Sequence, residues 1–83
     1  MAGTTWAVYA VHSSDSKHHN ATYTIDEMDD GSMQVFLDYE SGESDGVLLI
    51  GEGGFTDDGL LDEIDRLIRE QGLPPRGDAV VAG

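Results

Sequence analysis

Residues 55–72, with the sequence FTDDGLLDEIDRLIREQG, constrain this chain most, because the start, buried face and end of one helix can all be predicted there. Thr56 is a suitable N-cap, while Gly72 followed by Pro74 and Pro75 predicts the helix end. Apolar residues recur at three- and four-residue spacing and therefore share one stripe; they are Leu60, Leu61, Ile64, Leu67 and Ile68. Such a stripe must be covered, so the sequence predicts a helix packed on one face of a sheet.

Other segments have the apolar content or alternation of β-strands; they are residues 4–11, 21–27, 33–40 and 47–50. Segment 4–11 is apolar on both faces and is expected inside the sheet or under a partner. Segment 47–50 is expected to be a short strand buried on both faces, after a loop over residues 40–46. The predicted fold is therefore α+β, an antiparallel sheet of about four strands with one helix on one face, in the order β-β-β-β-α.

Two segments are expected to be less ordered parts of a single domain that spans residues 1–83. Residues 12–20, HSSDSKHHN, are polar throughout and are predicted to form a mobile loop. The tail over residues 73–83 has little apolar content, which predicts a loosely attached strand or a disordered end.

The two middle strand segments, 21–27 and 33–40, are predicted to form a hairpin whose register can be derived. A three-residue loop over 29–31, with Gly31 in the left-handed conformation, separates polar from apolar side chains better than a two-residue turn would. It pairs Ile25 with Val35 and Tyr23 with Leu37. The buried face then carries Tyr23, Ile25, Val35, Leu37 and Tyr39, and it is expected to meet the helix stripe. The outer face carries Thr22, Thr24, Asp26, Gln34, Phe36, Asp38 and Glu40.

Charge is the most unusual property of the sequence, because seventeen acidic residues stand against four Lys and Arg and give a formal net charge of -13. Between His18 and Asp65 there are fourteen acids and no Lys or Arg. On the helix, Asp62 with Arg66 and Asp65 with Arg69 have the i, i+4 spacing that permits ion pairs. The predicted sheet and its loops have no such partners, so their carboxylates repel one another.

Several classes of function are disfavoured by these properties. A nucleic-acid backbone or an anionic membrane would repel the chain, and its apolar runs, such as residues 47–50, are too short to span a bilayer. No cysteine is present and the first residues do not form a signal peptide, so a cytoplasmic location is expected. His12, His18 and His19 with Asp15 lie in a predicted loop, which disfavours a metal site. No cofactor, metal or catalytic residue is predicted, and the protein is expected not to be an enzyme.

The first functional hypothesis is a mimic of the phosphate backbone that binds a basic nucleic-acid-binding protein and excludes the nucleic acid. Phe36 would serve as an apolar anchor among the acids of the outer face. The predicted partner-binding residues are Asp26, Asp29, Asp30, Phe36, Asp38, Glu40, Glu43, Asp45 and Glu52. In size and acidity the chain is similar to small phage-encoded inhibitors of host defence, including anti-CRISPR proteins and anti-restriction DNA mimics. That similarity implies an inhibitor and rests on composition alone.

The alternative hypothesis is adaptation to high salt, with the protein being a structural or regulatory domain that does not mimic DNA. Eleven aspartates and six glutamates with a single lysine are a composition typical of proteins from salt-loving organisms. The apolar first strand leaves a further choice open. A homodimer formed through Tyr9 or Trp6 would cover that strand, and so would the C-terminal tail folded over the second face of the sheet.

Overall fold

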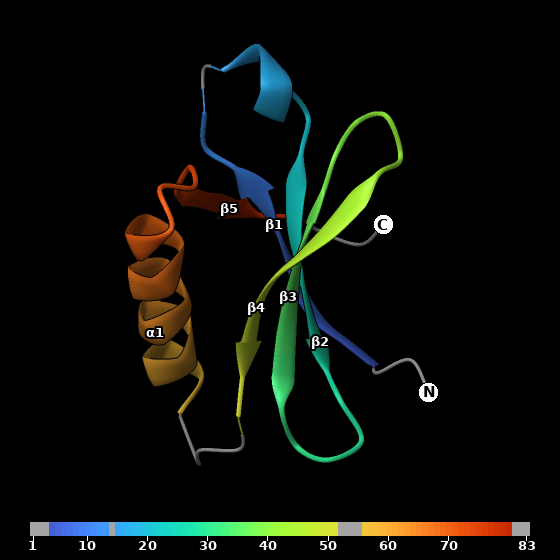
Figure 1. Cartoon of the computed structure of the whole chain (residues 1–83). Helices are drawn as coiled ribbons and strands as arrows, with labels where there is room; N and C mark the ends of the chain where they lie inside the picture. The colour runs from blue at the N-terminus through green and yellow to red at the C-terminus, as the bar shows by residue number, and fades with distance from the viewer. Residues whose placement is uncertain (1–3, 14, 52–55, 81–83) are drawn as a thin grey trace.

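The computed structural model describes residues 4–13, 15–51 and 56–80, which form an antiparallel sheet with one α-helix against one of its faces (Figure 1). The strands of this part of the chain lie in the order β4-β3-β2-β1-β5. In sequence order the elements are β1 (Thr4–Val11), the 3₁₀-helix η1 (Ser16–His18), β2 (Thr22–Glu27), β3 (Met33–Asp38), β4 (Ser44–Ile50), α1 (Asp57–Glu70) and β5 (Arg76–Ala79). The predicted α+β class and the single helix are confirmed.

The fifth strand, β5, comes from the C-terminal tail and extends the sheet beyond the four strands predicted. It pairs antiparallel with β1, with Tyr9 opposite Ala79 and Val11 opposite Arg76. The Tyr23 hydroxyl donates a hydrogen bond of 2.5 Å to the carbonyl oxygen of Pro74 just before the strand. The tail therefore continues the sheet at the edge of β1. Backbone pairing does not require apolar side chains, which explains how so polar a segment forms a strand.

The β2–β3 hairpin has the predicted register. Ile25 lies opposite Val35 and Tyr23 opposite Leu37. The Met28 amide donates to the Ser32 carbonyl oxygen at 2.8 Å, which closes a three-residue loop. Gly31 has a φ of 88°, the left-handed conformation that this loop requires.

The core lies between α1 and one face of the sheet, called the inner face below. Four side chains on this face are completely buried, namely Tyr23, Ile25, Val35 and Leu37. From the helix, Leu60, Ile64 and Ile68 are buried against them, while Leu61 and Leu67 are partly buried. Tyr39, also predicted on this face, is partly buried because it follows the end of β3.

Both helix ends have the caps that the sequence predicts. The Thr56 side chain accepts a hydrogen bond of 3.1 Å from the Gly59 amide. Gly72 has a φ of 74°, and its amide donates to the Arg69 carbonyl oxygen at 3.0 Å. The Leu73 amide donates to the Ile68 carbonyl oxygen at 3.1 Å, which completes a Schellman motif. The helix therefore cannot extend toward the prolines.

Strand β4 corrects the prediction for residues 40–50. It begins at Ser44, within the predicted loop, and it is not buried on both faces, because Leu49 is 69% exposed. Leu48 and Ile50 point toward the core, whereas Leu49 points to the face opposite the helix. The apolar run in β4 thus supplies one buried face and one exposed leucine.

The segment between β1 and β2 was predicted as a polar loop, and the structure places η1 within it. The Asp15 side chain accepts a hydrogen bond of 3.0 Å from the Lys17 amide at the start of this turn. His18 is only 9% exposed, and its ring centroid lies 6.0 Å from that of Tyr39. One histidine of this polar segment therefore packs on the protein instead of facing solvent.

Candidate protein-binding surface

The sheet face opposite α1, called the outer face below, is not crossed by any helix or strand that the structure describes (Figure 1). The strand registers place its side chains in three rows that run across the sheet from β1 to β4. These rows are Ala10, Thr22, Asp38 and Ser44; Val8, Thr24, Phe36 and Gly46; and Thr5, Asp26, Gln34 and Leu49. The outer face thus combines apolar, hydroxyl and carboxylate groups on one open surface.

Phe36 lies in the central row of the outer face. A Cβ atom built on its neighbour Gly46 would lie 3.7 Å from ring carbon Cε1 of Phe36, so the ring packs beside the bare backbone of β4. Asp26 and Asp38 occupy the rows on either side. The structure therefore places these three predicted site residues together, with the aromatic ring between two carboxylates.

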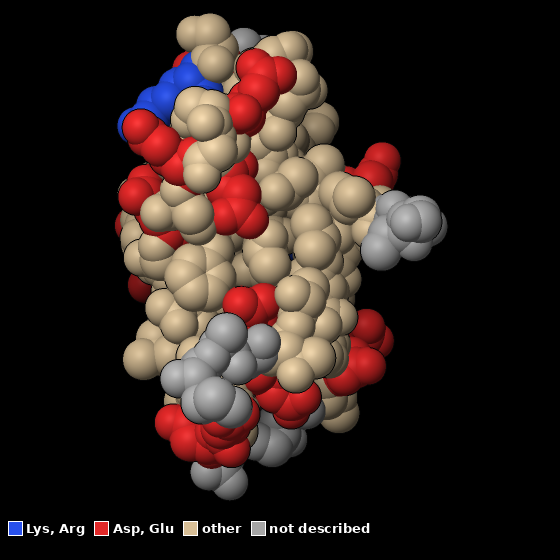
Figure 2. Space-filling model, turned by 90° about the vertical axis from the view of Figure 1, so that its right-hand side faces the viewer, with Lys and Arg blue, Asp and Glu red and all other residues tan. Residues whose placement is uncertain are grey.

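The remaining predicted site residues lie at the two ends of the sheet. Asp29 and Asp30 are in the β2–β3 turn, and three others, Glu40, Glu43 and Asp45, are in or beside the β3–β4 turn. Glu52 lies outside the described residues. Figure 2 shows acidic side chains at both ends, along both edges and near the middle of this side of the molecule, with uncharged side chains between them and a basic side chain at its upper left.

Neutral donors hold several of these carboxylates. Thr24 Oγ1 donates to Asp38 Oδ2 at 2.6 Å, and Asn20 Nδ2 donates to Glu40 Oε2 at 2.6 Å. No Lys or Arg within the described ranges forms an ion pair with an acid of the outer face or of its turns. Hydroxyl and amide donors can orient a carboxylate, but they leave its charge in place.

Asp30 at the tip of the β2–β3 turn follows the same pattern. Its Oδ1 accepts hydrogen bonds from Ser32 Oγ at 2.6 Å and from the Ser32 amide at 2.9 Å. These bonds from the side chain and the backbone of Ser32 lower the pKa of Asp30 from its ordinary value. Hydrogen bonding to the charged form favours ionisation, so Asp30 stays anionic well into the acid range.

Asp26 differs from the other described acids because one of its carboxylate oxygens is buried without a hydrogen-bond donor. Its Oδ1 is inaccessible to solvent and accepts no hydrogen bond within the part of the chain that the structure describes. The side chain lies between Thr5 and Gln34 in its row. A buried acceptor without a partner is costly, so this oxygen lowers the stability of the fold.

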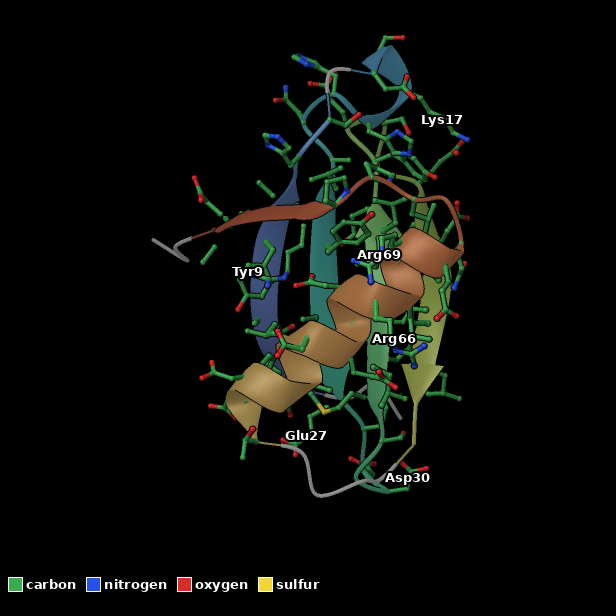
Figure 3. All side chains as sticks on the ribbon, turned by 90° about the vertical axis from the view of Figure 1, so that its left-hand side faces the viewer. Tyr9, Lys17, Glu27, Asp30, Arg66 and Arg69 are labelled. Atoms are coloured by element: carbon green, nitrogen blue, oxygen red, sulfur yellow. The ribbon has the colours of Figure 1, made fainter. Side chains whose placement is uncertain are left out.

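The helix side of the molecule has ion pairs that the outer face lacks. Arg66 donates to Glu63 at 2.8 and 2.9 Å and also to Glu70. Arg76 of β5 donates two bonds of 2.9 Å to Asp65 of the helix. Figure 3 shows this side, with Arg66 and Arg69 on the helix.

The predicted partners of the ion pairs within α1 are therefore wrong. Arg66 pairs with Glu63 instead of Asp62, and Asp65 pairs with Arg76 instead of Arg69. Asp65 faces the start of β5, where Arg76 also lies over the Tyr9 ring at 4.5 Å from its centroid. A contact between residues far apart in sequence thus replaced the local one, and the tail strand that supplies it was not predicted as part of the sheet.

Sequence reasoning missed several contributors to the outer face. Leu49 was expected in the core, although its alternation with Leu48 and Ile50 could have placed it outside. The donors Thr24 and Asn20 had no signal in a search for charged or catalytic groups. Their roles depend on cross-strand and loop contacts that a linear pattern does not contain.

Nδ1 of His18 lies 3.5 Å from Asp15, but no three His, Asp or Glu side chains in the described ranges are placed to hold a metal ion. Among the same residues, no helix has the length and apolar character needed to cross a membrane.

Comparisons of the chain with protein families, with curated proteins and with solved structures find no match. The outer face must therefore be interpreted from its own chemistry.

Proposed function

We propose that this protein is a non-catalytic inhibitor that binds a basic nucleic-acid-binding protein through the outer face of its sheet. The carboxylates of that face and of the adjoining turns would stand in for backbone phosphates in the positively charged channel of the partner. Occupying the channel would exclude DNA or RNA. This is the mode of action expected of the phage anti-defence inhibitors to which the composition is similar.

The observation that carries the proposal is that acids of the sheet are oriented without being neutralised. Asp38, Glu40 and Asp30 are held by Thr24, Asn20 and Ser32, respectively. A carboxylate that is already oriented loses less conformational freedom when it meets an arginine or lysine of a partner. Its retained charge also accelerates encounter with a cationic surface and makes the affinity fall as salt rises.

The apolar centre of the outer face supports a protein partner. Phe36 is partly buried beside Gly46, and Leu49 is largely exposed in the next row. Aromatic anchors near the middle of an interface, surrounded by polar groups that exclude water, carry much of the binding energy in protein complexes. Apolar groups beside carboxylates suit a protein channel that contains both basic and apolar side chains.

Salt adaptation is the second candidate, and one observation favours it. Exposed acids also occur on α1, well away from the outer face, at Asp57, Asp58 and Asp62. A partner that contacts only the outer face would give no reason for these acids. A halophilic protein would carry acids on every exposed element, because they retain water and cations at high salt.

Capture of partners at two ionic strengths tests the proposal against this alternative. Immobilised protein is exposed to a bacterial lysate at about 50 mM and about 500 mM salt, and its folding is followed by circular dichroism under both conditions. We expect a folded protein at low salt that retains a nucleic-acid-binding complex and releases it at high salt. Unfolding at low salt with no capture would favour salt adaptation instead.

A matched pair of variants locates the surface. Phe36→Ala with Asp38→Lys and Glu40→Lys should abolish capture and restore nucleic-acid binding by the partner. Asp62→Lys with Glu70→Lys makes the same change in charge on exposed positions of the helix and should have a much smaller effect. Equal losses from the two variants would show that net charge, and not the outer face, determines binding.

A further inference from the structure

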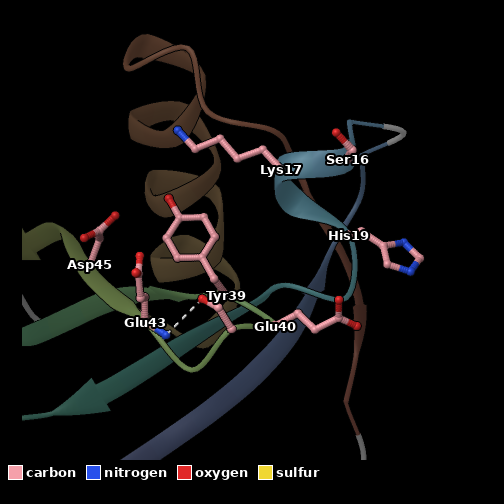
Figure 4. A pocket seen from close by; sticks show the side chains of 8 residues that line it. Ser16, Lys17, His19, Tyr39, Glu40, Glu43 and Asp45 are labelled. Atoms are coloured by element: carbon pink, nitrogen blue, oxygen red, sulfur yellow. Dashed lines mark hydrogen bonds between the residues drawn. The ribbon is translucent and has the colours of Figure 1, made fainter.

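A groove of about 480 Å³ lies between η1 and the β3–β4 turn, at one end of the sheet (Figure 4). Its lining includes Tyr39, Glu40, Glu43 and Asp45, with Lys17 at the opposite wall. In Figure 4 the Tyr39 ring stands between Asp45 and Lys17, and the Lys17 side chain extends past the ring. The groove is thus a concave site with an aromatic wall and three carboxylates.

The carboxylates of this groove have no cationic partner. Neither Lys17 nor any arginine of the described chain forms an ion pair with Glu40, Glu43 or Asp45. Asp45 and Glu43 also act on the tyrosine. Desolvation and the nearby carboxylates of Asp45 and Glu43 raise the pKa of Tyr39. The tyrosine and its acids therefore share one anionic environment.

The same combination of groups already holds an arginine elsewhere in this molecule. The Arg76 guanidinium lies 4.5 Å from the Tyr9 ring centroid and donates two hydrogen bonds of 2.9 Å to Asp65. A tyrosine ring and a carboxylate there bind the face and the edge of one guanidinium. The groove presents the same two groups, Tyr39 and Asp45, without the arginine.

We propose that this groove is the subsite for an arginine side chain of the partner, an inference that rests on the proposed function. The guanidinium stacks on the Tyr39 ring and donates to Asp45 and Glu43, as Arg76 does to Tyr9 and Asp65. Arginine fits this site better than lysine because its planar fork binds a carboxylate through two parallel bonds while its face contacts an aromatic ring. Nucleic-acid channels are rich in arginines that contact phosphates, which supplies such a side chain.

Binding of short cationic peptides to the intact protein tests this subsite. Labelled, acetylated oligo-arginine and oligo-lysine peptides of equal length are titrated with the protein, and their dissociation constants are measured by fluorescence anisotropy. We expect the arginine peptide to bind more tightly, and we expect its addition to shift the amide resonances around Tyr39. Equal affinity for the two peptides would overturn the proposal.

Variants of the groove separate recognition from attraction by net charge. Tyr39→Leu should weaken binding of the arginine peptide about fivefold and remove the preference over lysine, whereas Tyr39→Phe keeps the ring and should retain both. Asp45→Asn should weaken binding more than Asp29→Asn, which removes the same charge at the opposite end of the sheet. Equal losses of affinity in the two asparagine variants would contradict the subsite. If Tyr39→Leu does not fold, the comparison of Asp45→Asn with Asp29→Asn alone tests the proposal.

The subsite and the proposed function can fail separately. Suppose that binding of a captured nucleic-acid-binding partner is weakened by Phe36→Ala but unchanged by Tyr39→Leu and by Asp45→Asn. The proposed function then stands and the subsite is wrong. Tyr39-dependent preference for the arginine peptide, without capture of any nucleic-acid-binding protein, supports the subsite and contradicts the proposed function.

Discussion

The two sides of the sheet use acidic residues in opposite ways. On the side covered by α1, Glu63 and Glu70 pair with Arg66, and Asp65 pairs with Arg76. On the outer face and its turns, the acids for which a hydrogen bond was found are held by hydroxyl, amide and backbone donors that carry no charge. The described arginines all lie on the helix and β5, so the ion pairs with Arg are on that side, while the acids of the open face keep their charge.

This difference separates stability from binding. Side chains between the helix and the inner face are buried against one another, and the ion pair of Arg76 with Asp65 fastens β5 to α1. The outer face remains in contact with solvent and retains the charge of its carboxylates. No described helix or strand covers its aromatic ring, Phe36. We therefore expect changes on the helix side to alter the free energy of unfolding and changes on the outer face to alter affinity.

The largest effect is expected in the core. Ile64 is completely buried between the helix and the inner face, so Ile64→Ala should lower the free energy of unfolding by about 2–5 kcal/mol. Urea denaturation followed by circular dichroism measures this loss. The affinity of the remaining folded protein for its partner should not change. A large loss of affinity at constant folded concentration would break the separation between the two sides.

The next largest effect is expected from Phe36→Ala on the outer face. Loss of a central aromatic anchor should weaken partner binding by about 2 kcal/mol, or about thirtyfold. Isothermal titration calorimetry with the captured partner provides the measurement. Leu61→Ala is the matched control, because it removes a partly buried apolar side chain from the helix. Weaker binding by the control than by Phe36→Ala would show that the interface lies on the helix side.

A smaller effect is expected from the ion pair that joins α1 and β5. Arg76→Gln removes both bonds to Asp65 and the contact with Tyr9. Because Asp65 is 39% exposed and solvent screens the pair, we expect a loss of about 1 kcal/mol in the free energy of unfolding. Arg69→Gln is the control, since Arg69 forms no ion pair with any residue that the structure describes. If thermal denaturation shows equal losses of stability for Arg76→Gln and Arg69→Gln, the contacts of Arg76 with Asp65 and Tyr9 contribute nothing beyond the positive charge of the side chain.

The smallest effect concerns the exposed pair of Glu63 and Arg66. The hydrogen bond from Arg66 lowers the pKa of Glu63 below its ordinary value of 4.5. A carboxyl whose pKa is lowered by folding adds stability above its unfolded pKa and loses that contribution as the pH falls through its folded pKa. Glu63→Gln should therefore lower the melting temperature slightly at neutral pH. The difference from the unmodified protein should vanish in acid, and a difference that persisted there would have another origin.

The sequence was sufficient where one local pattern determined the structure. The stripe containing Ile64, the cap at Thr56 and the left-handed Gly31 each depend on neighbours within a few residues, and each was predicted correctly. The register that places Phe36 on the outer face followed from the same reasoning, because a shift by one residue would have reversed both faces of the hairpin.

The rest depends on contacts between distant segments. Nothing near Arg76 in the sequence indicates that its strand pairs with β1 or that its guanidinium reaches Asp65. Residues 65 and 76 meet only because Gly72 turns the chain back toward the sheet. Likewise, Thr24 meets Asp38 only through the hairpin. The acids could be counted from the sequence, but their donors could not be assigned.

One contact at the edge of the sheet bears on how a partner can approach. β4 is the outermost strand on its side, and an outermost strand offers unpaired carbonyl groups to any chain that could extend the sheet. The Gln71 side-chain amide donates to the Val47 carbonyl oxygen at 2.8 Å, and the register of β4 is interrupted beside it. The helix end therefore occupies a position that an added strand would need, which disfavours pairing of a second copy of the chain along β4.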